Sequence, residues 1–412
     1  MKQLGEILIS PQGGSEIVMG NTAIVRAMLE AGVRVVTSYP GSPTPEIAEA
    51  IAAIPKDKNP LYFEYSTNEK VATEVAFGAS VNGHLSTVFF KSVGLNVAAD
   101  SFVQLGHMEL IGGMVIVLGD DPGANSSQNE QDNRHYARLA YIPVLEPATP
   151  AEVYVMFKEA ARLSVQRHMP VILRLTTHVC HAKEKVHFAP WNPADVDNTP
   201  RFSPKNGPYI PITAQVFPLK RRALEKLAKF GEDADRSPLN TLVDHGNRSR
   251  GVLTMGAPYL SLLDVLEKAS VKPDILKLGI VHPLPKELIA DFLRRHDEIK
   301  VLEELDDFLE QQVKALAYDL GLSTKIIGKK DTDDWMNEYT PDKVDSVLRK
   351  TWPDLLPPLK IDNGQKPELA PRPPQLCPGC GHRSAFYAVK LALAQEDITV
   401  AEIGCHTLGY LE

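Results

Sequence analysis

Cysteine is scarce in this sequence, and the usual signs of a secreted or membrane protein are missing. Four cysteines among 412 residues are too few for a disulfide framework. No apolar run approaches the length of about eighteen residues that a membrane span requires. The N-terminus, MKQLGEILISPQGG, lacks the continuous apolar stretch of a signal peptide. These absences favour a cytoplasmic protein.

Charge is spread along the chain rather than gathered in blocks. The formal net charge is −8, and no block rich in Lys and Arg occurs. This argues against a nucleic-acid surface as the main function. Hydrophobic residues make up 43% and charged residues 23%, which is ordinary for globular protein. No internal repeat of fixed period is present, and the length predicts two to four domains.

Residues 1–186 alternate short, β-branched runs with helical patterns. Strand-like runs such as STVFFKS and GMVIVLG stand between amphipathic stretches such as GNTAIVRAMLEAG. This alternation predicts an α/β fold with a parallel sheet that helices cover on both faces. Ligands bind such sheets at the carboxyl ends of the strands. The loops at that edge are SYPGSPTP, EYSTNEK, KSVGLN and GDDPGANSS.

The composition changes four times after residue 186. Residues 187–250 are expected to form a linker with one basic helix, LKRRALEKLAKF, whose charges make a solvated face. Residues 251–345 predict a smaller α/β domain, and residues 346–375 a Pro-rich linker. Residues 376–412 offer one helix, SAFYAVKLALA, and one strand, ITVAEIG. So short a segment cannot bury a stable core unaided. We therefore expect it to be the start of a truncated domain or to complete itself against other polypeptide.

Glu69 is the first candidate for chemistry. It opens the helix expected over NEKVATEVAFGASVNG, and Gly78 follows nine residues later. A carboxylate at a helix start is also explained by the helix dipole alone. The pattern Glu-x8-Gly, with small alanines between, resembles the pyrimidine-binding domain of thiamine diphosphate enzymes. The resemblance implies that Glu69 hydrogen-bonds the aminopyrimidine ring and assists proton loss from the thiazolium C2.

Longer stretches extend this resemblance to a family. SYPGSPTPEI, KSVGLNVAADS and GDDPGANSSQNEQDNRHYA resemble the 2-oxoacid:ferredoxin oxidoreductases. The order of a pyrimidine-type domain, a small α/β domain and CPGCGH is similar to the alpha subunits of the indolepyruvate ferredoxin oxidoreductase branch. The resemblance covers residues 20–412. It implies a pyrimidine-type thiamine-diphosphate-binding domain at 1–186, a transketolase-C-terminal-like domain at 251–345, and the beginning of a diphosphate-binding domain at 376–412.

In that family, the loop that corresponds to SYPGSPTP reaches the substrate carboxylate and keto oxygen. The matching residues here are Tyr39, Pro40, Gly41, Ser42 and Pro43. A strand-ending turn with a helix cap explains the same residues without a substrate. On the KSVGLN loop, Lys91, Ser92 and Asn96 are further pocket candidates, and ordinary loop polarity is the alternative.

Gly119-Asp120 begins like the metal-diphosphate motif of thiamine enzymes but does not continue like it. The motif needs an Asn some 25–30 residues later, and residues 145–150 read LEPATP. We therefore interpret GDDPGANSS as a polar loop over the active site. Arg134 and His135 could contact substrate, or could belong to a capped surface helix.

Three cysteines gather near the C-terminus. Cys377-x2-Cys380 and Cys405 fall short of the four ligands of a structural zinc site. The resemblance implies either that they ligate a [4Fe–4S] cluster or that the loop packs around the cofactor, with Gly381 and His382 near the diphosphate. Cys180 is expected to be a buried small hydrophobe, and a metal site with His178 and His181 is the weaker alternative.

The resemblance implies a subunit that oxidatively decarboxylates aryl 2-oxoacids such as indolepyruvate. It implies thiamine diphosphate, Mg²⁺ and [4Fe–4S] clusters, mostly on segments or chains outside this sequence. It also implies coenzyme A as acyl acceptor, ferredoxin as electron acceptor, a beta subunit as partner, and a dimer of heterodimers. Two alternatives stay open: a non-oxidative thiamine-dependent decarboxylase, and a non-catalytic scaffold subunit.

Overall fold

The computed structural model describes residues 3–193, 199–359, 370, 375–400 and 404–410. The chain forms two compact units, Met1–Pro357 and Pro358–Glu412, which are described separately. Within the described residues, no helix combines the length and the apolar character needed to cross a membrane.

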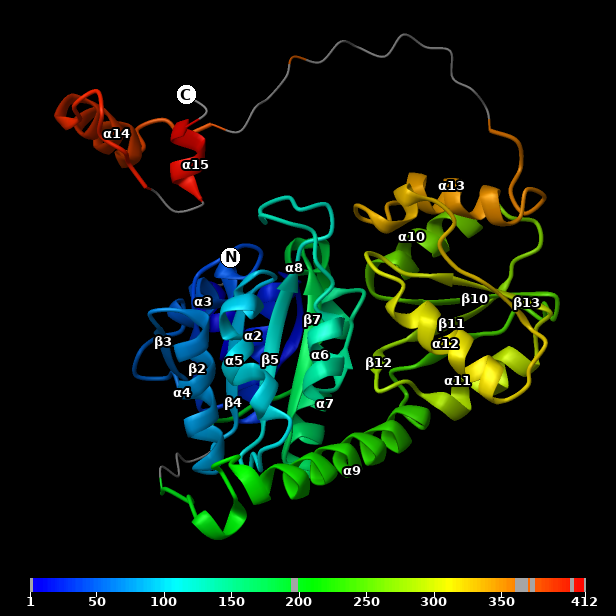
Figure 1. Cartoon of the computed structure of the whole chain (residues 1–412), viewed down its shortest axis with the longest axis horizontal. Coiled ribbons are helices and arrows are strands. Elements are labelled where there is room, and N and C mark those ends of the chain that lie inside the picture. Colours follow the sequence, from blue (N-terminus) through cyan, green and yellow to red (C-terminus); the bar gives the residue numbers. More distant parts are fainter. Residues whose placement is uncertain (1–2, 194–198, 360–369, 371–374, 401–403, 411–412) are drawn as a thin grey trace. The chain divides into compact units, whose positions relative to one another are not determined.

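A seven-stranded sheet with the order β12-β6-β7-β5-β4-β2-β3 organises the first half of the large unit (Figure 1). Its strands are parallel except β12, which pairs antiparallel with β6. Every residue of the central strands β5 and β7 is buried, as expected for a sheet covered on both faces. The parallel sheet predicted from the sequence is confirmed. The strands are β2 Val35–Ser38, β3 Tyr62–Tyr65, β4 Ser86–Lys91, β5 Met114–Asp120, β6 Val144–Leu145, β7 Pro170–Thr176 and β12 Ile280–His282.

Helices cover both faces of this sheet, because alternate strand side chains point to opposite sides. Phe89 and Val117 pack in one core with helices α2 Gly20–Ala31, α3 Pro45–Ala52 and α7 Pro150–Arg167. Phe90 and Leu118, one residue further along the same strands, pack in another core with α4 Glu69–Val81, α5 Gly94–Leu105 and α6 Arg134–Ala140. The sheet therefore separates two apolar layers.

An antiparallel ribbon of β1 (Gly14–Met19) and β8 (Lys183–Phe188) brings the two ends of this domain together. Two short helices, α1 Leu4–Leu8 and α8 Thr177–His181, flank it. The buried guanidinium of Arg26 fixes the ribbon by donating to the carbonyl oxygens of Leu8, Ser10 and Ala189 over 2.5–3.0 Å. Neither the ribbon nor these two helices was predicted from the sequence.

The second sheet is five-stranded, with the order β14-β13-β10-β11-β9. Its strands are β9 Thr241–Val243, β10 Arg250–Met255, β11 Asp274–Leu278, β13 Glu298–Leu302 and β14 Lys325–Ile327. The helices around it are α10 Gly256–Leu266, α11 Lys286–Arg294, α12 Phe308–Asp319 and α13 Pro341–Thr351. Short 3₁₀ turns occupy Pro204–Asn206, Thr213–Gln215 and Thr332–Trp335. Helix α13 continues through the domain boundary expected at residue 345.

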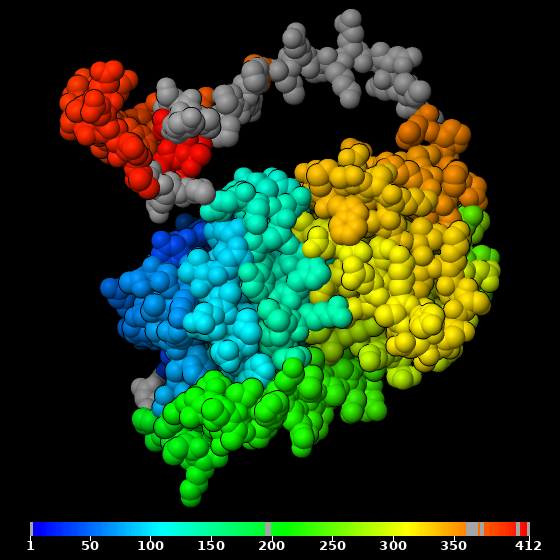
Figure 2. Space-filling view, in the orientation of Figure 1, coloured from blue at the N-terminus to red at the C-terminus, as the bar shows by residue number. Residues whose placement is uncertain are grey.

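The apolar stretch DILKLGIVHPLP divides between the two sheets. Residues before Gly279 form β11 of the five-stranded sheet, and residues after it form β12 of the seven-stranded sheet. A β-carbon on Gly279 would stand 2.6 Å from the carbonyl oxygen of Leu239, so only glycine fits this crossing. The segment that forms β11 of one sheet thus also supplies β12, the edge strand that pairs with β6 of the other, and residues drawn in yellow pack directly against residues drawn in cyan in Figure 2.

The basic helix α9 (Val216–Asp235) runs beneath both sheets in Figure 1. The expectation of a solvated charged face is wrong for Lys226. Its ammonium pairs with Glu109 over 3.0 Å and donates to the carbonyl oxygens of Met108 and His168. Burial lowers the pKa of Lys226 despite the Glu109 carboxylate. This lysine ties α9 to the first domain.

The small unit contains helices α14 (Gly381–Ala392) and α15 (Cys405–Tyr410). None of the residues of α14 is buried, which agrees with the expectation that this segment cannot form its own core. The aromatic rings of His382, Phe386 and His406 pack together, with centroids no more than 6.1 Å apart. The strand expected over ITVAEIG is wrong for residues 398–400, which are irregular, and residues 401–403 lie outside the described residues.

Candidate functional site

Glu69 lies at the carboxyl edge of the seven-stranded sheet, at the first position of α4. The helix begins there because Asn68 caps it, accepting a hydrogen bond from the Val71 amide over 2.9 Å. The Thr73 hydroxyl donates to the Glu69 carbonyl oxygen over 2.8 Å. The side chain of Glu69 is 6% exposed. The fold therefore holds one carboxyl group nearly out of water at the edge where ligands bind.

The carboxyl group of Glu69 is unusual because it has no side-chain partner. Within the described residues, it makes no hydrogen bond or ion pair with another residue. Burial raises the pKa of Glu69. A hydrogen bond from its own backbone N–H and the charge of Lys91 oppose this, but their combined effect is smaller. A buried acid without a partner is available to a ligand that can hydrogen-bond to it.

Gly94, the first residue of α5, lies directly against this carboxyl group. A β-carbon at Gly94 would stand 2.6 Å from Oε1 of Glu69 and 2.9 Å from its Cγ. No other residue type fits there unless Glu69 moves. The KSVGLN loop thus forms one wall of the Glu69 site.

The loop from Tyr39 to Pro43 lies beside the same site. A β-carbon on Gly41 would stand 2.6 Å from Cδ of Lys91, so the lysine stem packs on this glycine. The buried Asn21 amide holds the loop by donating to the Pro43 carbonyl oxygen over 2.7 Å. Tyr39 is half-buried, whereas Pro40 and Ser42 are exposed. The structure therefore brings Gly41, Lys91, Gly94 and Glu69 together.

The GDDPGANSS loop lies over Lys91. The lysine ammonium donates to the Ser126 carbonyl oxygen over 3.1 Å. Asn96 is exposed and exchanges two hydrogen bonds of 2.9 Å with Gln131 of the same segment. Asn96 therefore fastens this loop, and the structure gives it no contact with Glu69.

Asp120 is fully buried and already has its partners. Arg174 Nε donates to its Oδ2 over 2.6 Å, and Asn133 Nδ2 donates to its Oδ1. Burial raises the pKa of Asp120, and the charge of Arg174 opposes this. A carboxyl group held in this way is not free to bind Mg²⁺, which agrees with the reading of Gly119-Asp120 from the sequence.

The expectation that Arg134 lies on a surface helix is wrong, because the residue is buried in an ion-pair cluster. Its side chain is 1% exposed and forms ion pairs with Asp132 and Glu303. His135, beside it, is half exposed and contacts the Asp306 carboxylate over 3.0 Å. Asp132, His135 and Asp306 place ligand atoms within 4.8 Å of one another. Because Arg134 binds Asp132 through two nitrogens, this group carries no metal assignment.

Gly381, His382 and the three late cysteines belong to the small unit. Cys380 Sγ contacts His382 Nδ1 over 3.3 Å, and Cys377 and Cys405 are exposed. The three sulfurs do not all lie within 4.8 Å of one another. A single ion bound by all three would need sulfurs about 4 Å apart. Cys180, in the large unit, is buried as expected, and burial raises the pKa of its thiol.

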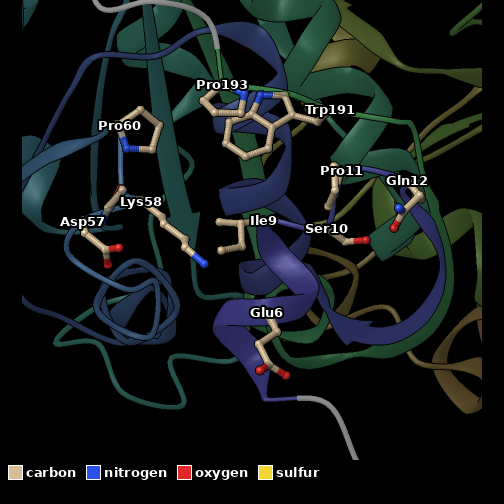
Figure 3. A pocket seen from close by; sticks show the side chains of 11 residues that line it. Glu6, Ile9, Ser10, Pro11, Gln12, Asp57, Lys58, Pro60, Trp191 and Pro193 are labelled. Carbon is tan, nitrogen blue, oxygen red and sulfur yellow. The ribbon is translucent and has the colours of Figure 1, made fainter.

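A cavity of about 750 Å³ lies away from Glu69, between the end of α1 and the loop before β3 (Figure 3). Ile9, Trp191 and three prolines give it apolar walls. Its charged residues, Glu6, Asp57 and Lys58, are exposed. Size alone does not identify a site here, because this cavity lacks the buried, unpartnered polar group that the Glu69 region has.

Sequence reasoning did not single out Gly94, Asn133 or Asn21. A glycine just after a strand, opening a helix, was the available signal for Gly94. Asn133 and Asn21 act through contacts 13 to 41 residues away in sequence, which no local pattern indicates.

Comparison with known proteins adds the family. Residues 26–227 match the family model described as pyruvate flavodoxin/ferredoxin oxidoreductase, thiamine diphosphate-binding. The indolepyruvate oxidoreductase subunit IorA of Methanothermobacter marburgensis is 39% identical over 99% of this chain and 66% of its own length. The subunit of the same name from Thermococcus kodakarensis is 36% identical over all of this chain and 65% of its own. The chain spans about two thirds of the length of these relatives.

Solved structures share the fold at low identity. A 2-oxoglutarate:ferredoxin oxidoreductase from Magnetococcus marinus matches with a TM-score of 0.64 and 14% identity, covering 82% of this chain and 65% of that one. A split-gene transketolase matches with a TM-score of 0.51 and 15% identity, covering 81% and 97%. By fold and by sequence, the chain belongs to the 2-oxoacid:ferredoxin oxidoreductase family, in the group of the indolepyruvate oxidoreductase IorA subunits.

Proposed function

We propose that this chain is the subunit of a thiamine-diphosphate-dependent 2-oxoacid oxidoreductase that carries the cofactor-activating glutamate, Glu69. The proposed substrates are aryl pyruvates such as indolepyruvate, and the products are the acyl-coenzyme A and CO₂. Electrons would pass through [4Fe–4S] clusters to ferredoxin. The observation that carries the proposal is the largely buried Glu69 at the carboxyl edge of the sheet, whose carboxyl group makes no hydrogen bond or ion pair with another described residue.

The residues around Glu69 fit the aminopyrimidine part of thiamine diphosphate. Gly94 has no side chain to displace the carboxyl group that lies against it, and the fully buried Ala72 keeps the inner face of α4 small. When bound, the cofactor supplies the carbanion stabilisation that decarboxylation of a 2-oxoacid needs. Glu69 would hold a proton in a hydrogen bond to the aminopyrimidine ring. Burial raises the pKa of this acid, which favours the proton-holding form that the hydrogen bond needs.

The substrate would be oriented by the loops beside Glu69. Lys91 offers an ammonium group for a carboxylate, and its stem is held on Gly41. Tyr39, Pro40 and Ser42 belong to the neighbouring loop, where the Ser42 hydroxyl is exposed and able to donate to a keto oxygen. Asn96 supports the pocket only through Gln131.

The described residues near Glu69 do not fit Mg²⁺ and the diphosphate, because Asp120 is fully engaged. We assign the diphosphate contacts to the small unit, where Gly381 opens α14 and His382 follows it. Cys377, Cys380 and Cys405 are proposed cluster ligands. The relatives are named as subunits, which supports a partner, proposed here to be a beta subunit. We further propose that the two subunits assemble as a dimer of heterodimers.

The test is turnover by the purified complex that contains Glu69→Gln. With indolepyruvate, coenzyme A and a one-electron acceptor, we expect a loss of about 10²–10⁴-fold, the usual contribution of a positioned acid or base. Glu74→Gln, on the exposed side of the same helix, is the matched control and keeps full activity. Unchanged turnover in Glu69→Gln would make this residue structural and favour a scaffold role.

A further inference from the structure

Ser92 lies between the two residues that shape the Glu69 environment. Lys91 precedes it and lowers the pKa of Glu69 through its charge, and Gly94 follows two residues later and packs on the carboxyl group. Ser92 is 2% exposed, and its carbonyl oxygen accepts from the Leu95 amide over 3.2 Å in the first turn of α5. Contacts that fix the position of Ser92 therefore also fix the positions of Lys91 and Gly94.

Asn133 holds Ser92 in place. It lies in the segment that follows GDDPGANSS, directly before α6. One N–H of its side-chain amide is shared between the Ser92 hydroxyl, at 2.9 Å, and the Ser92 carbonyl oxygen, at 3.2 Å. Its own carbonyl oxygen accepts from Gln131 over 2.7 Å. The side chain is 1% exposed, so water does not compete for these bonds.

The same amide is anchored to the middle of the sheet. Asn133 also donates to Asp120, whose other oxygen accepts from Arg174 Nε over 2.6 Å. Arg174, Asp120, Asn133 and Ser92 thus form an unbroken buried chain of hydrogen bonds. It runs from β7 through β5 to the turn between β4 and α5.

We infer that Asn133 is a positioning residue for the proposed cofactor site: it fixes Ser92, and through it Lys91 and Gly94, against Glu69. This inference rests on the proposed role of Glu69. Asn133 makes no contact with Glu69 that the structure describes, so it acts only by holding the turn. A displacement of the turn by about 1 Å is enough to cost up to about a hundredfold in rate.

A double-mutant cycle in the purified complex tests the inference. Asn133→Ala is expected to lower kcat by about tenfold to a hundredfold, with little change in the KM for the 2-oxoacid. In a Glu69→Gln background the same substitution should have almost no further effect, because it acts through Glu69. A merely structural role would lower the rate by the same factor in both backgrounds, and that result would overturn the inference.

Two further variants keep the test decisive if Asn133→Ala folds poorly. Ser92→Ala removes only the hydroxyl end of the link and should show a smaller loss with the same non-additivity. Gln128→Ala, at an exposed position in the segment before Asn133, should leave turnover unchanged. If Glu69→Gln alone leaves turnover intact, the proposed function fails. If it abolishes turnover while neither Asn133→Ala nor Ser92→Ala lowers it, only the positioning role fails.

Discussion

Arg134 Nη1 donates to Oε2 of Glu303 over 3.0 Å, and both side chains are 1% exposed. Arg134 opens α6 of the first domain, whereas Glu303 follows β13 of the second sheet. The same guanidinium binds Asp132, and Glu303 also accepts from the amides of Leu309 and Glu310. One buried cation therefore neutralises carboxylates from both halves of the large unit.

Arg134→Met should destabilise the large unit strongly. It leaves the carboxylates of Asp132 and Glu303 buried without their counter-charge, which typically costs about 3–5 kcal/mol in free energy of unfolding. Urea unfolding of the purified chain measures this. Arg162→Met breaks an exposed pair with Glu159 and should cost less than about 1 kcal/mol. Equal effects of the two substitutions would contradict the importance of the buried cluster.

Glu304→Gln should change how stability depends on pH. One oxygen of Glu304 accepts from the Tyr339 amide over 2.8 Å, and the other has no partner among the described atoms. Burial raises the pKa of this carboxyl group from 4.5 to about 7. The folded chain therefore keeps a proton that the unfolded chain releases, so this contribution to stability is complete below pH 4.5 and is lost as pH rises to 7.

Glutamine mimics the protonated form of Glu304. The Glu304→Gln variant should therefore not lose this stability as pH rises. The free energy of unfolding of Glu304→Gln, relative to the unsubstituted chain, should rise by about 3 kcal/mol between pH 4.5 and 8. Urea titrations at several pH values give this difference. Exposed Glu74→Gln should show no such trend, and a flat difference for Glu304→Gln would mean that Glu304 ionises normally.

Gly94→Ala should remove cofactor activation without unfolding the chain. The new β-carbon would meet Oε1 of Glu69 at 2.6 Å, so the carboxyl group must move. We expect thiamine diphosphate affinity and turnover to fall by at least about tenfold. Gly231→Ala in α9 meets its nearest atom at 3.7 Å and is the control, with unchanged turnover and a slightly more stable helix. Equal activity of both variants would show that the Glu69 carboxyl group tolerates displacement.

The cysteines can be tested by metal analysis of the purified complex. If Cys377 and Cys380 ligate a [4Fe–4S] cluster, the double replacement by serine should remove about four iron atoms and as many labile sulfides per chain. Cys180→Ala, at a buried position, should leave the iron content unchanged. An iron content equal to that of the unsubstituted complex would mean that these thiols hold no cluster. A complex without any iron would favour the non-oxidative decarboxylase.

Local sequence patterns were sufficient to predict those helices and strands whose signals come from residues close together in the sequence. Helix α4 was predictable from Asn68 and its apolar spacing, and β5 from its continuous apolar run, because neighbours in sequence supply those signals. The ribbon of β1 and β8 was missed, because its strands are half exposed and pair across some 170 residues. The division of a single apolar run at Gly279 depends on which sheet each half meets, and this is a tertiary effect.

The site was predictable in part for the same reason. The sequence indicated Glu69 through the pattern Glu-x8-Gly, but the lack of a partner residue for its carboxyl group can be seen only in three dimensions. Arg134 reads as a surface residue in NRHYARLA, yet burial against Glu303 reverses that interpretation. An ion pair between residues far apart in the sequence produces no periodic pattern from which it could be predicted.

Strand β12 has a practical consequence for anyone who wishes to produce the two halves of the large unit separately. A cut in the segment before β10 looks natural, but it would strip β6 of its outer neighbour, since Ile280 and His282 pair with Leu145 and Val144. The truncated half would then expose an apolar sheet margin, and such margins promote aggregation. A usable fragment of the first half would have to carry β12 along, for instance on a short grafted linker.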